Sequence, residues 1–129
     1  MSDSSRSHIP AGLRAVTPYL SVDDAAGLIS FMEAALGAET IERHEDGDRV
    51  AHAKVSIDGC AIEVSSRGEG FPATTAALHL YIADVDAVHQ AAVAAGATEL
   101  YPPTDHDYGE RGSGVRDPFG NHWWLATAK

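Results

Sequence analysis

The fold of this sequence is decided by one stretch near its end, Val115-Arg116-Asp117-Pro118-Phe119-Gly120-Asn121-His122-Trp123-Trp124. Pro118 and Gly120 form a turn that neither a helix nor a central strand would contain. The apolar run that follows, from His122 to Ala126, has the length and composition of a strand. The stretch therefore predicts a tight turn that sends the chain into a final strand.

The segment before this turn predicts a strand, a helix and two further strands. The expected strand runs from Leu78 to Ala83, and the acids of Asp84-Val85-Asp86 open the helix. Its inner face would carry Val85, Val88, Ala92 and Ala95, and Gly96 would end it. Strands are then expected over 98–101 and 114–116, before the final strand over 122–126.

The first half of the chain predicts the same order of elements. A strand is expected over 15–22, with Val16, Leu20 and Val22 on one face. Asp23-Asp24 would open a helix that carries a buried stripe and ends at Gly37. Strands are expected over 39–44, 50–57 and 60–65, and Asp58-Gly59 is a hairpin signal between the last two.

Two copies of strand, helix and three strands indicate a duplicated βαβββ unit. Gly37-Ala38 in the first copy corresponds to Gly96-Ala97 in the second. Neither copy could bury its sheet face alone, so we predict one α+β domain with helices outside a curved, barrel-like cup. The expected divisions are a flexible tail over 1–13, a first module over 14–65, a linker over 66–76 and a second module over 77–129.

Composition excludes several classes of protein. The chain has 129 residues, 44% hydrophobic, and a formal net charge of −10, which argues against nucleic acid as a partner because phosphate binding needs a basic patch. No apolar run is long enough to span a membrane, and residues 1–10 lack the apolar core of a signal peptide. The single cysteine, Cys60, favours a reducing compartment, so we expect a cytoplasmic protein.

The duplicated unit together with the Asp-Pro-Phe-Gly turn resembles the glyoxalase/bleomycin resistance protein/dioxygenase superfamily, also called vicinal oxygen chelate proteins. The resemblance covers nearly the whole chain, roughly 13–127, and the stretch from Tyr108 to Gly114 is similar to an uncharacterised glyoxalase-like subgroup. It implies two βαβββ modules, a ligand site on the free sheet faces and a homodimer, with modules that pair within one chain or across two.

Metal-dependent members of this superfamily hold a divalent ion with four side chains on the first and last strands of each module. The corresponding positions here are Thr17, Glu63, Ala77 and Trp124. Only Glu63 is an ordinary metal ligand, although His79 lies two residues beyond Ala77 on the same face. We therefore expect no metal cofactor. The alternative is a non-standard Zn²⁺ or Fe²⁺ site drawn from His52, Glu63, His79 and His122.

The alternation of side chains predicts which residues line the cup. The expected ligand-binding set combines aromatic rings, imidazoles and one carboxylate: Tyr19, His52, Glu63, His79, Tyr81, His122 and Trp124. Of the adjacent tryptophans, Trp123 should be buried and Trp124 should face the cup. Tyr108 and Arg111 are expected in a glycine-rich loop, either as a lid over an anionic part of a ligand or, for Arg111, paired with a surface carboxylate.

Such a cup favours a small-molecule-binding protein with a planar or cationic ligand. The resemblance to the bleomycin-resistance branch implies that the protein sequesters such a ligand, for example an antibiotic, without a metal. The alternative is a metal-dependent lyase, isomerase or dioxygenase that uses the non-standard His/Glu site. A metal-free enzyme, with His79 or His122 as general base and Glu63 as its orienting partner, is a third possibility. The sequence leaves open whether the protein is catalytic at all.

Overall fold

The computed structural model describes residues 8–68 and 73–128. The elements of the first module are β1 (Tyr19–Val22), α1 (Ala25–Leu36), β2 (Glu39–Asp46), β3 (Arg49–Ile57) and β4 (Cys60–Ser66). The elements of the second module are β5 (Ala77–Tyr81), α2 (Val85–Ala94), β6 (Thr98–His106), β7 (Glu110–Arg116) and β8 (His122–Ala128). The predicted duplication of a βαβββ unit is confirmed.

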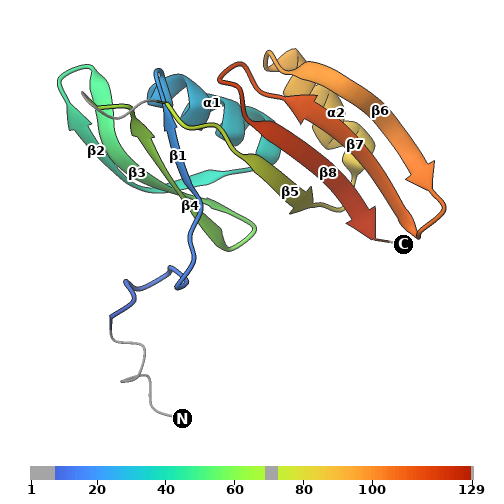
Figure 1. Cartoon of the computed structure of the whole chain (residues 1–129), viewed down its shortest axis with the longest axis horizontal. Coiled ribbons are helices and arrows are strands. Elements are labelled where there is room, and N and C mark those ends of the chain that lie inside the picture. Colours follow the sequence, from blue (N-terminus) through green and yellow to red (C-terminus); the bar gives the residue numbers. More distant parts are fainter. Residues whose placement is uncertain (1–7, 69–72, 129) are drawn as a thin grey trace, which may run out of the picture.

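Each module forms a four-stranded sheet. The strand orders are β1-β4-β3-β2 and β5-β8-β7-β6, and in each module the first strand pairs in parallel with the last. Figure 1 shows the two curved sheets side by side, with β5 of the second sheet nearest the first. The α+β class and the curved sheets agree with the prediction, and the sheets do not close into a barrel within the chain.

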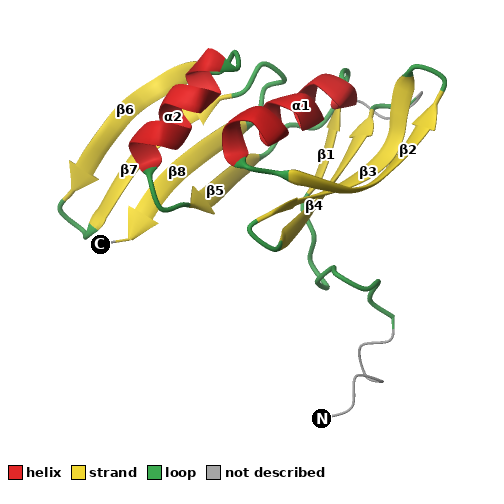
Figure 2. Ribbon diagram, turned by 180° about the vertical axis from the view of Figure 1, so that it is seen from behind, coloured by secondary structure: helices red, strands yellow, loops and turns green. Residues whose placement is uncertain are grey.

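Both helices cover the same side of the sheets. Asp24 begins α1 by accepting a hydrogen bond from the Gly27 backbone N–H at 2.9 Å, and Gly37 ends it with φ of 70°. Figure 2 shows α1 and α2 packed next to each other over the two sheets. The opposite side of each sheet carries no helix. No helix in the described part of the chain is long and apolar enough to cross a membrane.

The core lies between the helices and the sheets. Leu28, Ile29 and Met32 of α1 are fully buried against strand residues such as Val55 and Val64. Burying side chains of this kind contributes about 1.5–3 kcal/mol each. Trp123 is 1% exposed, whereas Trp124 is only partly buried, so the predicted division between the two tryptophans is confirmed.

The first strand is shorter than predicted. It begins at Tyr19, and Val16, expected on the buried face, is 87% exposed. Pro18 explains the difference, because proline has no N–H to donate to a neighbouring strand. Its carbonyl still accepts a hydrogen bond from the Glu63 N–H at 2.9 Å, so sheet pairing begins directly after the ring.

The second hairpin is longer than predicted. β6 continues through Pro102 and Pro103 to His106, which is possible because β6 lies at the edge of its sheet. β7 begins at Glu110, so Arg111 lies on a strand and not in a loop. Tyr108 remains in the turn between these strands. Of the glycines that suggested a loop, Gly109 lies in the turn, whereas Gly112 and Gly114 are strand residues of β7. The missing side chain of Gly114 makes room for neighbouring aromatic rings.

One inner-face residue of α2 was missed. The helix buries Val85, His89 and Ala92, while Val88 and Ala95 are only partly buried. His89 is 4% exposed, and its ring nitrogens lie 2.8 Å from Ser113 Oγ and 2.7 Å from Glu99 Oε1. Both nitrogens therefore have partners, which is what a buried imidazole requires. The predicted tail and linker lie partly outside the described residues.

The turn before β8 is built around a buried carboxylate. Asp117 is 2% exposed, and its Oδ1 accepts hydrogen bonds from the Phe119 N–H at 2.9 Å and the Asn121 N–H at 3.0 Å. Its Oδ2 accepts from Trp123 Nε1 at 2.9 Å and Asn121 Nδ2 at 3.1 Å. Asn121 Oδ1 in turn accepts from the Ala76 N–H at 3.0 Å, which ties the turn to the start of β5.

The substitution Asp117→Ala should lower the free energy of unfolding by roughly 3 kcal/mol, because it leaves buried donors without an acceptor. Urea denaturation followed by far-ultraviolet circular dichroism measures this change. Asp107→Ala is the matched control, since Asp107 is exposed in a turn, and it should change stability by less than about 0.5 kcal/mol. Equal stability of the two variants would contradict the structural role of Asp117.

Candidate functional site

The free face of the first sheet brings together three of the predicted site residues. Tyr19 of β1 lies in register with Glu63 of β4, and the His52 ring from β3 lies 6.1 Å from the Tyr19 ring. His52 Nε2 is 2.8 Å from Glu63 Oε1, and both side chains are partly buried. Glu63 is therefore the partner of His52, and in this chain it does not orient His79 or His122.

A second charged cluster borders this trio. Lys54 Nζ lies 3.4 Å from Glu42 Oε1, and His44 Nε2 lies 3.3 Å from Glu42 Oε2. The hydrogen bond from His44 and the nearby Lys54 ammonium lower the pKa of Glu42. The His44 ring is also stacked 6.5 Å from the His52 ring. Sequence reasoning did not assign Glu42, His44 or Lys54 to the site.

The free face of the second sheet holds the other four predicted cup residues. His79 and Tyr81 of β5 stack with ring centres 4.5 Å apart. His122 and Trp124 of β8 meet edge to face at 5.5 Å. Because β5 and β8 are parallel neighbours and His79 is in register with Trp124, the four rings form one aromatic surface. Within one chain the sheet that carries this surface lies beside the first sheet, which carries the His52–Glu63 pair (Figure 1).

The Trp124 ring packs against the backbone of a glycine on the neighbouring strand. It stacks 6.4 Å from the Tyr101 ring, and both cover Gly114 on β7. A β-carbon at Gly114 would lie 2.7 Å from Trp124 and 2.8 Å from Tyr101, closer than packed atoms allow. Glycine at this position therefore lets the two rings extend along the sheet. The result is an aromatic floor, which we define as Tyr101 and Trp124 over Gly114.

The turn between β6 and β7 extends this floor. The rings of His106 and Tyr108 stack 4.9 Å apart and nearly parallel, and His106 also meets Tyr101 edge to face. Tyr108 is 68% exposed, as expected of a residue that could cover a ligand. Sequence reasoning missed Tyr101 and His106. His106 was missed because the predicted strand ended at Tyr101, before the two prolines of β6.

Glu110 and Tyr81 form a polar pair at the end of the same face. The Tyr81 hydroxyl donates a hydrogen bond to Glu110 Oε2 at 2.8 Å. This hydrogen bond to the carboxylate raises the pKa of Tyr81, because loss of the phenol proton would leave two negative groups together. The pKa of Tyr101 is also raised, chiefly by burial. Both phenols are therefore hydrogen-bond donors at neutral pH.

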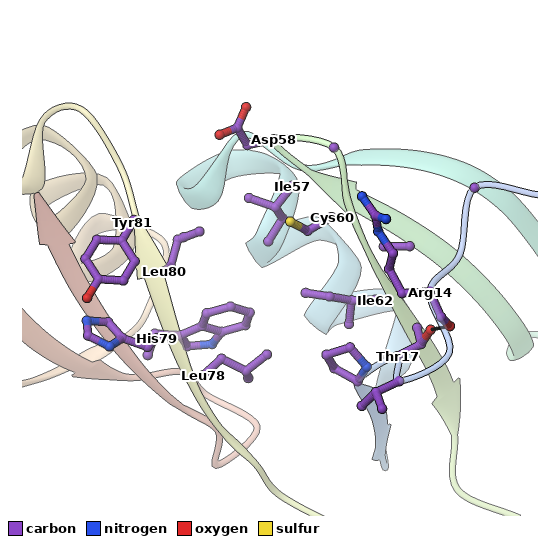
Figure 3. A pocket seen from close by; sticks show the side chains of 16 residues that line it. Arg14, Thr17, Ile57, Asp58, Cys60, Ile62, Leu78, His79, Leu80 and Tyr81 are labelled. Carbon is purple, nitrogen blue, oxygen red and sulfur yellow. Dashed lines mark hydrogen bonds between the residues drawn. The ribbon is translucent and has the colours of Figure 1, made fainter. Parts of the chain in front are cut away.

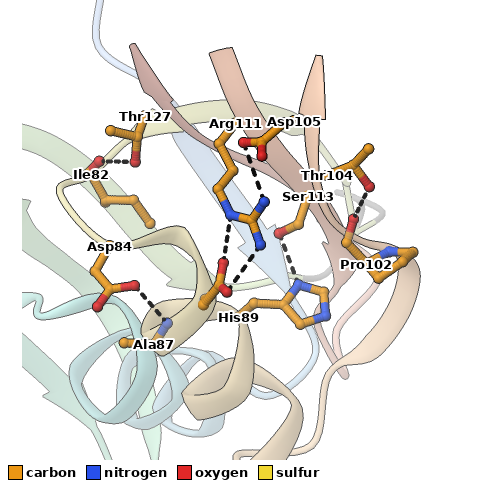
Figure 4. Close-up of polar contacts among 11 residues, drawn as sticks. Ile82, Asp84, Ala87, His89, Pro102, Thr104, Asp105, Arg111, Ser113 and Thr127 are labelled. Carbon is orange, nitrogen blue, oxygen red and sulfur yellow. Dashed lines mark hydrogen bonds and ion pairs between the residues drawn. The ribbon is translucent and has the colours of Figure 1, made fainter. Parts of the chain in front are cut away.

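Arg111 points away from the aromatic floor. Figure 4 shows its guanidinium beside Asp105 of β6, and the same guanidinium pairs with Asp86 of α2. Two bonds join it to Asp86, at 2.8 and 3.0 Å, and they lower the pKa of that carboxyl. This ion pairing is the second of the two alternatives that the sequence offered, and a role in ligand binding stays a prediction.

The described residues of one chain do not come together as a metal site. Thr17 precedes β1, and its hydroxyl donates to the Arg14 carbonyl at 3.0 Å. His52 and Glu63 belong to the first sheet, whereas His79 and His122 belong to the second. Within residues 8–68 and 73–128, no group of three or more His, Cys, Asp or Glu side chains is placed to hold an ion.

Comparison with known proteins identifies similar chains and folds. The family model described as the Glyoxalase/Bleomycin resistance protein/Dioxygenase superfamily matches residues 12–125. An uncharacterised protein of Mycobacterium bovis is 35% identical over 123 residues, which cover 86% of this chain and 81% of that protein. A similar uncharacterised protein of Mycobacterium tuberculosis is also 35% identical, over 86% of this chain and 72% of its own length.

Solved structures share the fold at lower identity. TioX from Micromonospora sp. ML1 superposes with a TM-score of 0.77 at 22% identity, over 90% of this chain and 99% of TioX. An enzyme of the glyoxalase/bleomycin resistance protein/dioxygenase family from Burkholderia phytofirmans superposes with a TM-score of 0.74 at 16% identity, over 88% of this chain and 97% of that one. These likenesses concern the fold.

The substitution Glu110→Gln should lower the pKa of Tyr81, since it removes the negative charge that opposes tyrosinate formation. Tyr81 should then lose its proton at a lower pH than in the parent protein. A titration followed by NMR of ¹³C-labelled tyrosine Cζ measures the change. Glu45→Gln, on the other sheet, is the control and should leave the Tyr81 titration unchanged. An unaltered Tyr81 titration in Glu110→Gln would exclude the pair.

Proposed function

We propose that this chain, which belongs to the Glyoxalase/Bleomycin resistance protein/Dioxygenase superfamily, sequesters a planar or cationic small molecule without using a metal. The observation that carries the proposal is the aromatic floor of Tyr101 and Trp124 over Gly114. Flat, partly exposed rings on a rigid strand bind planar ligands by stacking and cations through their ring faces.

Polar groups around the floor support the same ligand class. The carboxylate of Glu110 lies on this face through its bond to Tyr81, and it would attract a positive group at the edge of a stacked ring. The formal net charge of −10 would also favour the approach of a cation. Tyr108, exposed in the turn before β7, would close over the ligand from the end of the sheet.

A homodimer would complete the site. The floor belongs to the second sheet and the His52–Glu63 pair to the first, and the side of each sheet opposite the helices carries no helix (Figure 1). A second copy related by a twofold axis would place the first sheet of one chain opposite the second sheet of the other. The ligand would then lie between Trp124 of one protomer and Glu63 of its partner. We propose a cytoplasmic location as well, in line with the single cysteine.

The floor can be tested with a planar cation such as proflavine as the probe. Trp124→Ala should weaken proflavine binding about tenfold, because it removes a ring face that contributes about 1–2 kcal/mol. Isothermal titration calorimetry measures the affinity. Trp124→Phe is the matched control and should keep most of it. If Trp124→Ala binds proflavine as tightly as the parent protein, stacking on Trp124 is ruled out.

The alternative function is a metal-dependent lyase, isomerase or dioxygenase with a non-standard site. The close His52–Glu63 pair favours it, since a dimer could add His79 and His122 from the opposite sheet. Our proposal predicts that purified protein contains no stoichiometric Zn²⁺ or Fe²⁺ and that added divalent ions leave its melting temperature unchanged. Elemental analysis measures the content. Stoichiometric metal that is lost in Glu63→Ala or His79→Ala would support the enzyme instead.

A further inference from the structure

A hollow lies between the two modules, away from the aromatic floor. It is a cleft of about 510 Å³ between β5 and the β3–β4 hairpin, and this volume is typical of small-molecule sites. We call it the inter-module cleft. Figure 3 shows Leu78 and Leu80 directed into it from β5, while the rings of His79 and Tyr81 lie on the other side of that strand. Its opposite wall includes Ile57 and Ile62.

One positively charged side chain, that of Arg14, lines the inter-module cleft. Arg14 lines the cleft from the N-terminal segment, and Figure 3 places it on the same side as Cys60, across from Leu80. A local turn fixes its backbone, because the Arg14 carbonyl accepts a hydrogen bond from the Thr17 hydroxyl at 3.0 Å. Asp58 also borders the cleft, but its carboxylate is directed outward at the edge (Figure 3).

The Arg14 guanidinium has no partner within the described residues, although acids outnumber bases by 19 to 9 in this chain. Most other described cations form ion pairs: Arg43, Arg49, Lys54, Arg67 and Arg111. Among the other described lysines and arginines, only Arg116 also lacks an ion-pair partner, and Arg116 does not line the cleft. An unpaired arginine beside apolar walls is suited to a carboxylate that carries a hydrocarbon body.

We propose that the inter-module cleft is a second ligand site, which binds a free apolar monocarboxylate. The hydrocarbon body would lie between Leu78 and Leu80 on one side and Ile57 and Ile62 on the other, and its carboxylate would pair with Arg14. This site differs from the aromatic floor in charge preference and in the residues that form it. The inference does not rest on the proposed function.

Decanoate is the probe for this site. Isothermal titration calorimetry should show that decanoate binds and that Arg14→Gln weakens it about tenfold, through loss of a charge-assisted pair. The matched control, Arg116→Gln, removes the other unpaired arginine and should leave the affinity unchanged. Decanol and decyltrimethylammonium share the decyl chain, and both should bind at least about tenfold more weakly than decanoate.

Cys60 reports the location of the probe. It is the only cysteine in the chain, its side chain is exposed, and it borders the cleft. Saturating decanoate should slow its alkylation by iodoacetamide, followed by mass spectrometry, at least about fivefold. The same protection should appear in Trp124→Ala, because Trp124 does not line the cleft.

Three outcomes would overturn the proposal. The first is equal decanoate affinity in Arg14→Gln and the parent protein. The second is loss of decanoate binding in Trp124→Ala, which would place the probe on the aromatic floor and leave the proposed function intact. The third is a Cys60 that resists alkylation without ligand and becomes reactive on dilution, which would show that a second copy of the chain covers the cleft.

Discussion

The structure depends on the hydrogen bonds that the buried carboxylate of Asp117 accepts. Asp117 accepts hydrogen bonds from two backbone N–H groups, an amide and an indole, so a charge that would be costly in the core becomes the centre of a turn. The turn then carries Phe119 across to the first module, where its ring lies over Gly27 of α1. A β-carbon at Gly27 would approach this ring to 2.8 Å. The turn therefore joins the two copies as well as starting β8.

Because side chains alternate along each strand, the open sides of the two sheets carry different chemical groups. Residues such as Val55 and Trp123 face the helices, and their neighbours along the same strands face the open side. The first sheet presents the paired imidazole and carboxylate of His52 and Glu63. The second presents the stacked rings that include Trp124. Each surface is half of the environment that a planar cation requires, which is why we expect two chains to form one site.

Sequence reasoning predicted the repeated unit, the class of the fold and the facing of the tryptophans, since all of these follow from periodicity and turn chemistry. It failed where tertiary contacts override a local signal. Pro18 shortened β1, whereas the prolines of β6 were accommodated at a sheet edge. Gly112 was expected in a glycine-rich loop, but it is a strand position of β7. The burial of His89 depends on partners that are distant in sequence.

The contact between α1 and α2 has a mechanical consequence. Among the named helices and strands it is the only pairing that crosses from one module to the other, because no strand of the first sheet contacts a strand of the second. Two sheets that are joined through packed helices and the contact of Phe119 with α1 can change their mutual angle at little cost, since packed helices slide by small amounts without losing burial. A ligand bound next to the α1–α2 contact would therefore set the angle between the two sheets. It would thereby set the orientation of the aromatic floor relative to the surface that faces it.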